Sequence, residues 1–238
     1  PRLDQRRKDR LVAPLSEALQ EAPGSLGTVR NAVLLLELLA DGPAHQQLTD
    51  LADRSGLTLP TVHRLLRSLA LAGLVEQDAR SARYGLGPEL VRLAHRYLAR
   101  LPALGALAPY LAQVRDATGA TVRVQLLVGT SVVDVDRVDG PDAGLYREPN
   151  SVRPALACAS GRLLGSRTDD ERWKHVLSEC DEPTRAVAEV ERERWASATH
   201  LVVDDPAGGA REVAVPVVAT APGGGMPLVA LAVDLPTG

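Results

Sequence analysis

Ser160, His200 and Asp204 supply the side-chain types of a nucleophile, a general base and an orienting carboxylate. Hydrolases that use such a serine often carry it on a Gly-x-Ser-x-Gly turn, whereas the serine here stands in Ala-Cys-Ala-Ser-Gly. Cys158 lies in the same apolar run, which is typical of a core cysteine rather than of a nucleophile. The sequence therefore predicts no catalytic residues, and we do not expect an enzyme.

Metal and redox chemistry have equally little support. The chain contains 2 cysteines, Cys158 and Cys180, which fits a reducing compartment better than a disulfide scaffold. His175 precedes Cys180 at a spacing that matches no strong metal-ligand pattern. There is also no apolar run of transmembrane length and no signal-peptide pattern at the start. We therefore expect a cytoplasmic protein with no metal, no cofactor and no membrane partner.

Binding chemistry is suggested instead by the stretch GLTLPTVHRLLRSLALAGLVEQDARSARYGLG, residues 56–87. At about 100° per residue, the apolar residues between 62 and 69 fall on one helix face and leave Arg64 and Arg67 on the opposite face. An arginine there can bind a guanine edge or a phosphate, and hydroxyl groups near the helix start suit a phosphate. Arginines beside the following turn could reach the DNA backbone or the minor groove. The candidate DNA contacts are Thr58, Pro60, Thr61, His63, Arg64, Arg67, Ser68, Arg80 and Arg83.

The placement of charge matters because neither the chain nor this region is basic overall. The formal net charge is −3, so overall charge gives no attraction for nucleic acid. Residues 24–86 contain six arginines and six acidic residues, but the stretch 57–75 contains two arginines and no acidic residue. This distribution favours DNA binding and leaves a winged helix that contacts protein as the alternative. A protein-docking wing would more often show an exposed apolar patch, and the turn sequence ARSAR shows none.

The elements that must position these residues follow from periodicity and its breaks. Three helical patterns and then two short strand patterns span residues 28–40, 46–56, 59–73, 74–78 and 83–87. Only a few residues around Gly56 separate the second and third helices, a length that suits two helices meeting at a steep angle. Three helices followed by a hairpin predict a winged helix-turn-helix.

The second half of the chain changes in character. A helical pattern at 87–100 carries an apolar stripe that either packs on its own domain or joins two domains: Leu90, Leu93, Ala94, Tyr97 and Leu98. Strand patterns then occur near 121–140 and again after residue 200, with helical patterns between them, which predicts an α+β unit. The charged segment 1–24 is expected to be a solvated arm, with contact to DNA phosphates as the alternative. The predicted division is 1–24 arm, 25–86 winged helix-turn-helix, 87–101 linker helix and 102–238 α+β domain.

The first of these domains resembles a known family. The run LLELLADGPAHQQLTDLADRSGLTLPTVHRLLRSLALAGLVEQDARSARYGLGPELVRLA contains a GLTLPTVHRLL core, an AGLVEQD exit and an RYGLG closing strand. It is similar to the N-terminal domain of the IclR family of transcriptional regulators. Downstream, RPALACASGRLLGS, REVAVPVV and PLVALAVDLP resemble the effector-binding domain of that family, a GAF-like α+β unit. The resemblance runs from about Thr28 to Pro236.

The resemblance implies a homodimer, often paired into a tetramer, that binds a palindromic double-stranded DNA operator and a small-molecule effector. In the family the effector pocket lies between a helix start with an A-S-G-[KR] motif and the final strands. Here the helix start at 158–161 is expected to point free N–H groups into a cavity closed by strands at 211–219 and 228–235. Carried over by position, the effector-binding candidates are Ala159, Ser160, Gly161, Asp204, Val213, Ala232 and Asp234.

The chain departs from the family's pattern at this site. Val213 and Ala232 supply no hydroxyl or thiol, Asp234 adds a carboxylate, and the segment 154–156 lacks the usual histidine. An inward-facing Asp234 would repel an anionic ligand in a poorly hydrated site. We therefore expect a neutral or weakly basic effector, or one with a phenolic donor. Two arginines could instead neutralise Asp234 and make it structural: Arg211 and Arg153.

Overall fold

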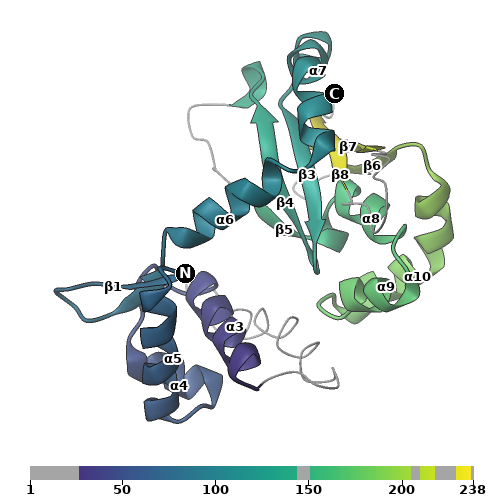
Figure 1. Cartoon of the computed structure of the whole chain (residues 1–238). Helices are drawn as coiled ribbons and strands as arrows, with labels where there is room; N and C mark the ends of the chain where they lie inside the picture. Colours follow the sequence, from purple (N-terminus) through teal and green to yellow (C-terminus); the bar gives the residue numbers. More distant parts are fainter. Residues whose placement is uncertain (1–26, 144–150, 205–209, 218–228, 237–238) are drawn as a thin grey trace, which may run out of the picture. The chain divides into compact units, whose positions relative to one another are not determined.

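The computed structural model describes residues 27–143, 151–204, 210–217 and 229–236, and the arm expected at 1–24 lies outside them. Contacts within the chain divide it into two compact units, Pro1–Tyr97 and Leu98–Gly238. The hydrophobic clusters of the two units share no residue, so each unit is described by itself. Figure 1 labels the helices and strands of both units.

The described part of the N-terminal unit contains three helices, a two-stranded hairpin and a further helix after the hairpin. These elements are α3 (Gly27–Ala40), α4 (Leu48–Ser55), α5 (Leu59–Leu71), β1 (Val75–Gln77), β2 (Tyr84–Leu86) and α6 (Glu89–Leu98). Leu35, Leu51 and Leu66 of the three helices are fully buried and meet Val75 and Tyr84 of the hairpin in one core. Helices and hairpin therefore bury a common apolar interior, which is the main stabilising contribution in a unit of this size.

Two glycines set the sharp turns between these elements. Gly56, which follows α4, has a φ of 68°, and Gly73, which follows α5, has a φ of 71°. Residues with a side chain rarely adopt this left-handed region, so glycine ends each helix without strain. The turn between α4 and α5 consequently needs only residues 56–58.

Gln46 joins the hairpin to the helices. Its backbone exchanges two hydrogen bonds of 2.8 Å with the backbone of Tyr84. Its buried side chain donates from Nε2 to the carbonyl oxygen of Leu38 at 2.8 Å and accepts at Oε1 from Arg54 at 2.6 Å. One residue thus satisfies a carbonyl at the end of α3, which lacks a partner within its own helix, and holds β2 beside it.

The C-terminal unit is built on a six-stranded antiparallel sheet with the strand order β5-β4-β3-β8-β7-β6. The strands are β3 (Val122–Val128), β4 (Ser131–Val138), β5 (Val152–Pro154), β6 (Leu201–Asp204), β7 (Ala210–Val217) and β8 (Val229–Pro236). The helices are α7 (Pro102–Thr118), α8 (Ala159–Gly165), α9 (Asp170–Leu177) and α10 (Glu182–Ser197), with single 3-10 turns at Pro141–Ala143 and Ala155–Ala157.

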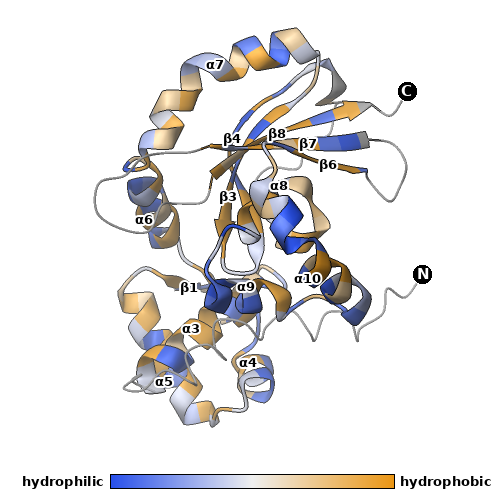
Figure 2. Cartoon of the chain, turned by 90° about the vertical axis from the view of Figure 1, so that its right-hand side faces the viewer, coloured by the Kyte–Doolittle hydropathy of each residue, from blue (hydrophilic) through white to orange (hydrophobic). Residues whose placement is uncertain are grey.

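Each face of this sheet carries its own core, because side chains alternate between the faces along a strand. On one face Val122 and Leu126 of β3 pack with Leu111 of α7. On the other face Ala232 of β8 packs with Leu163 of α8 and with side chains of α9 and α10. Figure 2 shows α7 on one side of the strands and α8 and α10 on the other.

The α+β fold class predicted from the sequence is confirmed, with helix-turn-helix and hairpin first and a helix-covered sheet second. Most of the expected helices and strands agree with the structure within a few residues. Strand β5 was not predicted, because three residues ending in Pro154 are too few to show an alternating pattern.

Candidate functional site

Helix α5 turns one face to the core and the other to solvent. Its buried side chains are those of Val62, Leu65, Leu66 and Leu69. The side chains predicted to contact DNA lie on the remaining surface, exposed at Thr58, Pro60, His63, Arg64, Arg67 and Ser68 and half-buried at Thr61. The hydroxyl groups of Thr58 and Thr61 are 2.9 Å apart at the helix start. Pro60 lies in the first turn, where its missing N–H removes no helical hydrogen bond.

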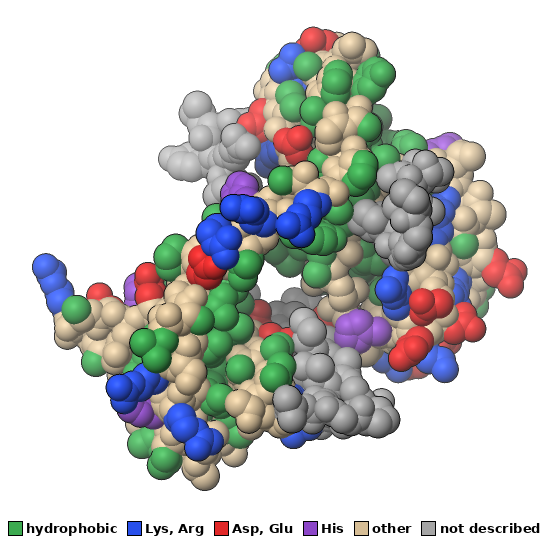
Figure 3. Space-filling model, viewed as in Figure 1, with side chains coloured by type: hydrophobic (Ala, Val, Ile, Leu, Met, Phe, Trp, Pro, Cys, Tyr) green, Lys and Arg blue, Asp and Glu red, His purple; other side chains and the backbone are tan. Residues whose placement is uncertain are grey.

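The hairpin turn presents Arg80 and Arg83 at exposed positions. Asp78 Oδ1 accepts hydrogen bonds from the N–H of Arg80 at 3.0 Å, the N–H of Ser81 at 2.6 Å and the hydroxyl of Ser81 at 2.8 Å. These bonds, first that of the Ser81 backbone, lower the pKa of Asp78. Ala82 completes the turn with a φ of 56°. Figure 3 shows basic side chains at the tip of this hairpin and over the exposed surface of the helices of the same unit.

The arginines of this surface have no carboxylate partner in the described part of the chain. Within the described parts of the chain, no ion pair involves Arg64, Arg67, Arg80 or Arg83. Their guanidinium groups are therefore available to base edges or phosphates, which an arginine can bind with two parallel hydrogen bonds.

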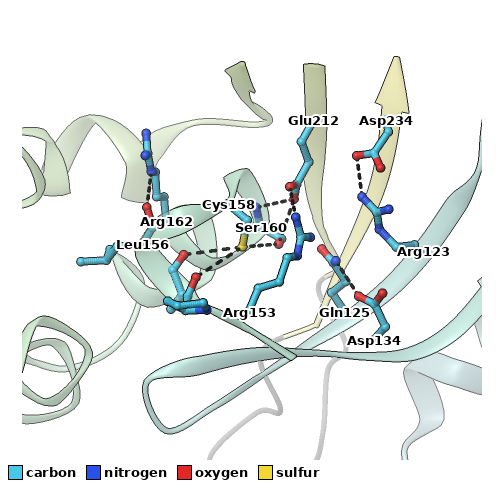
Figure 4. A network of polar contacts seen from close by, with 12 residues as sticks. Arg123, Gln125, Asp134, Arg153, Leu156, Cys158, Ser160, Arg162, Glu212 and Asp234 are labelled. Carbon is cyan, nitrogen blue, oxygen red and sulfur yellow. Dashed lines mark hydrogen bonds and ion pairs between the residues drawn. The ribbon is translucent and has the colours of Figure 1, made fainter. Parts of the chain in front are cut away.

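A polar cluster lies on the α8 face of the sheet (Figure 4). Ser160 of α8 is fully buried and donates its N–H at 3.3 Å and its hydroxyl at 3.1 Å to Glu212 Oε1 on β7. The second oxygen of Glu212 accepts from Arg153 of β5 at 2.9 Å. The expectation of free N–H groups at 158–161 was therefore wrong for Ser160, because a side chain of the same chain already binds it.

Asp234 is neutralised by an arginine that the sequence analysis did not identify. Arg123 on the neighbouring strand β3 places its Nη2 atom 2.5 Å from Asp234 Oδ1. The alternative that an arginine neutralises Asp234 therefore applies, but the arginine is neither Arg211 nor Arg153. These two arginines bind other carboxylates, Arg153 that of Glu212 and Arg211 that of Asp204.

Five polar side chains of this cluster were not among the predicted site residues: Arg123, Gln125, Asp134, Arg153 and Glu212. Gln125 is fully buried, and its Nε2 atom donates to Asp134 Oδ1 at 2.7 Å. A signal for part of the cluster is present in the sequence, since Arg123 and Gln125 alternate with apolar residues in TVRVQLLV. Polar residues at every second position of an otherwise apolar strand indicate one polar stretch on a buried face.

The predicted effector-binding residues are divided between the two faces of the sheet. Those on the α8 face are Ala159, Ser160, Gly161, Ala232 and Asp234. Asp204 and Val213 lie on the opposite face, since alternation along β6 and β7 directs their neighbours Leu201 and Ala214 toward α8. The structure thus brings five of the seven together with the polar cluster and separates the other two from it.

The residue types of a catalytic triad are not assembled. Ser160 is hydrogen-bonded to Glu212, Asp204 is paired on the other face of the sheet, and His200 Nδ1 lies 3.3 Å from the hydroxyl of the residue before it. Cys158 is buried, and burial, followed by the negative charge of Glu212, raises the pKa of its thiol. A protonated thiol in the core is a poor nucleophile.

In the residues that the structure describes, no three His, Cys, Asp or Glu side chains are grouped so that they could hold a metal ion. None of the helices described there is both long and apolar enough to span a bilayer. Among the described residues, binding chemistry is offered by the arginine surface of the N-terminal unit and by the polar cluster of the C-terminal unit.

Residues 28–79, which cover α3 from its second residue and all of α4, α5 and β1, match the family model of the IclR helix-turn-helix domain. The glycerol operon regulatory protein of Streptomyces coelicolor is 32% identical over 143 residues, which are 60% of this chain and 56% of that protein. The chain thus aligns with little more than half the length of this curated relative.

Solved structures extend the likeness to the C-terminal unit. The crystal structure of a putative IclR transcriptional regulator from a Silicibacter species has a TM-score of 0.71 at 28% identity, over 89% of this chain and 86% of that chain. An IclR homologue from Microbacterium hydrocarbonoxydans, complexed with 4-hydroxybenzoate, has a TM-score of 0.64 over 88% and 89% of the two chains. Its identity of 20% makes this a likeness of fold alone. Residues 28–79 thus match the IclR helix-turn-helix domain, and the fold that continues beyond them is similar to that of IclR-family transcriptional regulators.

Proposed function

We propose that this protein is a cytoplasmic DNA-binding transcription regulator whose operator affinity depends on a small-molecule effector. The observation that carries the proposal is the exposed face of α5, where Arg64 and Arg67 have no acidic partner among the described residues. Such a face attracts a polyanion although the chain has a net charge of −3, because charges beyond a Debye length of roughly 8 Å are largely screened.

In this proposal α5 enters the major groove of DNA. The short side chains of Thr58 and Ser68 let the helix approach the bases closely, and Arg64 binds a guanine edge with two hydrogen bonds. Arg80 and Arg83 of the hairpin bind the flanking phosphates or enter the minor groove. Arg64 then specifies the sequence, whereas the hairpin arginines contribute affinity for any sequence.

Two further parts of the proposal concern assembly and the effector. A single winged helix reads too few base pairs to select one site in a genome, so we expect two copies on a palindromic operator. The effector is expected to bind in the region 102–238, where the polar cluster around Ser160 and Glu212 offers hydrogen-bonding groups. The complex of the Microbacterium homologue with 4-hydroxybenzoate supports an effector of small size. Such a ligand alters operator affinity only if it binds the two conformations of the protein unequally.

The test compares arginine variants on two DNA probes, a duplex enriched from a random pool on the native protein and a random-sequence duplex. Arg64→Ala should weaken binding to the enriched duplex by on the order of 1–3 kcal/mol and reduce its preference over the random duplex. Arg80→Ala and Arg83→Ala should weaken both duplexes alike and flatten the salt dependence of the dissociation constant.

Arg194→Ala removes an exposed arginine of α10 and is the matched control, which should leave binding to both duplexes unchanged. If Arg64→Ala loses the same binding free energy on both duplexes, this residue binds a phosphate rather than a base edge. If the native protein shows no salt-dependent binding to either duplex, the proposal fails in favour of a winged helix that contacts protein.

A further inference from the structure

The side-chain carboxylate of Glu212 accepts hydrogen bonds from donor groups that could otherwise bind the carboxylate of a ligand. Its Oε1 atom accepts from the N–H of Ser160 at 3.3 Å and from the hydroxyl at 3.1 Å, and its Oε2 atom accepts from Arg153 at 2.9 Å. Hydrogen bonds from an arginine to a carboxylate are among the strong ones in proteins. Ser160 is 0% and Glu212 is 7% exposed, so water competes little for these bonds.

Arg153 reaches Glu212 across the sheet. In the order β5-β4-β3-β8-β7, four strand spacings separate their strands, which in a flat sheet would amount to roughly 19 Å. An arginine side chain cannot span that distance, so the sheet must curl and bring β5 toward β7 on the α8 face. Figure 4 shows Arg153 extending toward Glu212, with Gln125 nearby on the same face of the sheet.

The charges of the cluster disfavour an additional anion. Three carboxylates of the cluster, those of Asp134, Glu212 and Asp234, are paired with only two arginines, Arg123 and Arg153. The guanidinium of Arg162 on α8 donates to the carbonyl oxygen of Leu156 and lies over the ring of Trp195 instead. An incoming carboxylate would meet this excess of negative charge in a poorly hydrated place and would have to displace Glu212 from its partners. The displaced carboxylate would then itself be left unpaired, which is costly for a buried charge.

The cluster also contains polar atoms without a hydrogen-bond partner. Three of its buried atoms have no hydrogen-bond partner among the described residues: Arg123 Nε, Arg153 Nη2 and Gln125 Oε1. Two are donors and one is an acceptor, and a hydroxyl group can both accept and donate. Buried polar atoms of this kind are unfavourable unless a ligand or water binds them. A neutral hydroxylated molecule could satisfy them without displacing Glu212.

We propose that Glu212 is a built-in ligand that occupies the donors of Ser160 and Arg153, excludes free small carboxylates and thereby selects a neutral hydroxylated effector. This inference rests on the proposed effector site in the C-terminal unit. It makes Glu212 a specificity-determining residue of that site.

Removal of the Glu212 carboxylate should allow a carboxylate from solution to bind in its place. We expect Glu212→Ala to lower the Tm of the full chain, and sodium acetate to recover part of that loss where sodium chloride at the same ionic strength does not. Acetate should bind this variant at least about tenfold more tightly than the native protein, which corresponds to about 1.4 kcal/mol. Two controls should gain no acetate response: Glu212→Gln, whose amide still fills the position, and Asp204→Ala, which removes an exposed carboxylate on the opposite face.

Calorimetry with 4-hydroxybenzyl alcohol and 4-hydroxybenzoate then tests the ligand class, because the two share a ring and differ in the neutral or charged group. The native protein should prefer the alcohol, and Glu212→Ala should reverse the order. If Glu212→Ala does not stay folded, its refolding yield in sodium acetate is compared with that in sodium chloride, and a higher yield in acetate supports the inference. A variant that refolds in neither salt counts against it.

Two results overturn the inference outright. One is binding of acetate or 4-hydroxybenzoate to the native protein as tightly as to Glu212→Ala. The other is a folded Glu212→Ala protein without any acetate response. Neither measurement involves DNA, so either result would overturn the role of Glu212 without contradicting the proposed DNA-binding function.

Discussion

Gly161 shows how a single residue can be fixed by space rather than by ligand chemistry. A Cβ atom at this position of α8 would lie 2.0 Å from the carbonyl oxygen of Ala155. Non-bonded atoms do not approach so closely, so the turn at 155–157 packs on α8 only because residue 161 has no side chain. This close packing positions the adjacent Ser160, which in turn holds Glu212.

We expect Gly161→Ala to lower the free energy of unfolding by roughly 1–3 kcal/mol, because an extra methyl group is forced into a packed core. Gly105→Ala is the matched control in α7, where no neighbouring described atom would lie within 4 Å of the new Cβ. It should raise the free energy of unfolding by roughly 0.5–1 kcal/mol, because alanine loses less conformational entropy in a helix. Denaturant titration of both variants measures the difference, and a Gly161→Ala protein as stable as the native one would refute the packing argument.

The sequence indicated several residues of the candidate site but not their partners. The helix start around Ser160 was predicted from its position in a motif. Glu212 meets Ser160 across 52 residues of sequence, and Arg123 meets Asp234 across 111. Pairings of that range depend on strand order, register and the curl of the sheet, which local hydrophobic periodicity does not encode. The partner of Asp234 was mispredicted for this reason.

At the scale of elements, the hairpin turn of the N-terminal unit depends on Asp78. Its carboxylate accepts three hydrogen bonds from Arg80 and Ser81, all within the turn that presents the hairpin arginines. The bonds favour the ionised form and lower the pKa of Asp78 below its ordinary value of 3.8. A lowered pKa in the folded state means that the contribution to stability is present above the ordinary value and is lost as the pH falls through the lowered one.

We therefore expect the NMR amide signals of Arg80 and Ser81 to shift together as the pH falls below 3.8, because both amides lose the ionised carboxylate that they bind. Asp78→Asn keeps an oxygen acceptor without a titrating group and should make the turn independent of pH in this window. Asp78→Ala should loosen the turn at every pH. Retention of the native amide shifts in Asp78→Ala would show that the carboxylate does not hold the turn.

Elements were predictable where the sequence pattern is long and periodic. In α5, Val62, Leu65, Leu66 and Leu69 mark the buried face, and the structure buries these four side chains. Strand β5 offers only three residues, and its burial alternates weakly at the edge of the sheet. It is nevertheless the strand that delivers Arg153, so the least predictable element carries one of the groups that matter for the site.

At the scale of the whole molecule, α6 is notable for what it leaves exposed. None of its side chains is buried, and Val91, Leu93 and Tyr97 are 59%, 46% and 51% exposed. Leu93 and Tyr97 lie one turn apart on the same helix face, and exposed apolar side chains that adjoin in this way often mark an interaction surface. We therefore propose that the linker helix predicted at 87–101 forms part of a homodimer surface, with packing within its own chain as the alternative.

We expect Leu93→Glu to weaken self-association in sedimentation experiments and to lower operator affinity in parallel, since a charge would be desolvated at the interface. Val190→Glu adds the same charge at an apolar position of α10 that is 81% exposed, and it should leave the assembly unchanged. A folded Leu93→Glu protein that assembles as the native one does would remove this helix from the interface.

The double role of Gln46 has a consequence for cooperativity. Because one residue both binds the carbonyl of Leu38 and pairs with Tyr84, the end of α3 and the hairpin cannot melt independently. Fraying of that helix end would release the backbone bonds that hold β2, and detachment of the hairpin would expose the buried amide of Gln46. The helices and the hairpin that carries Arg80 and Arg83 should therefore form a single folding unit, in which the proposed DNA-contacting surface is either complete or absent.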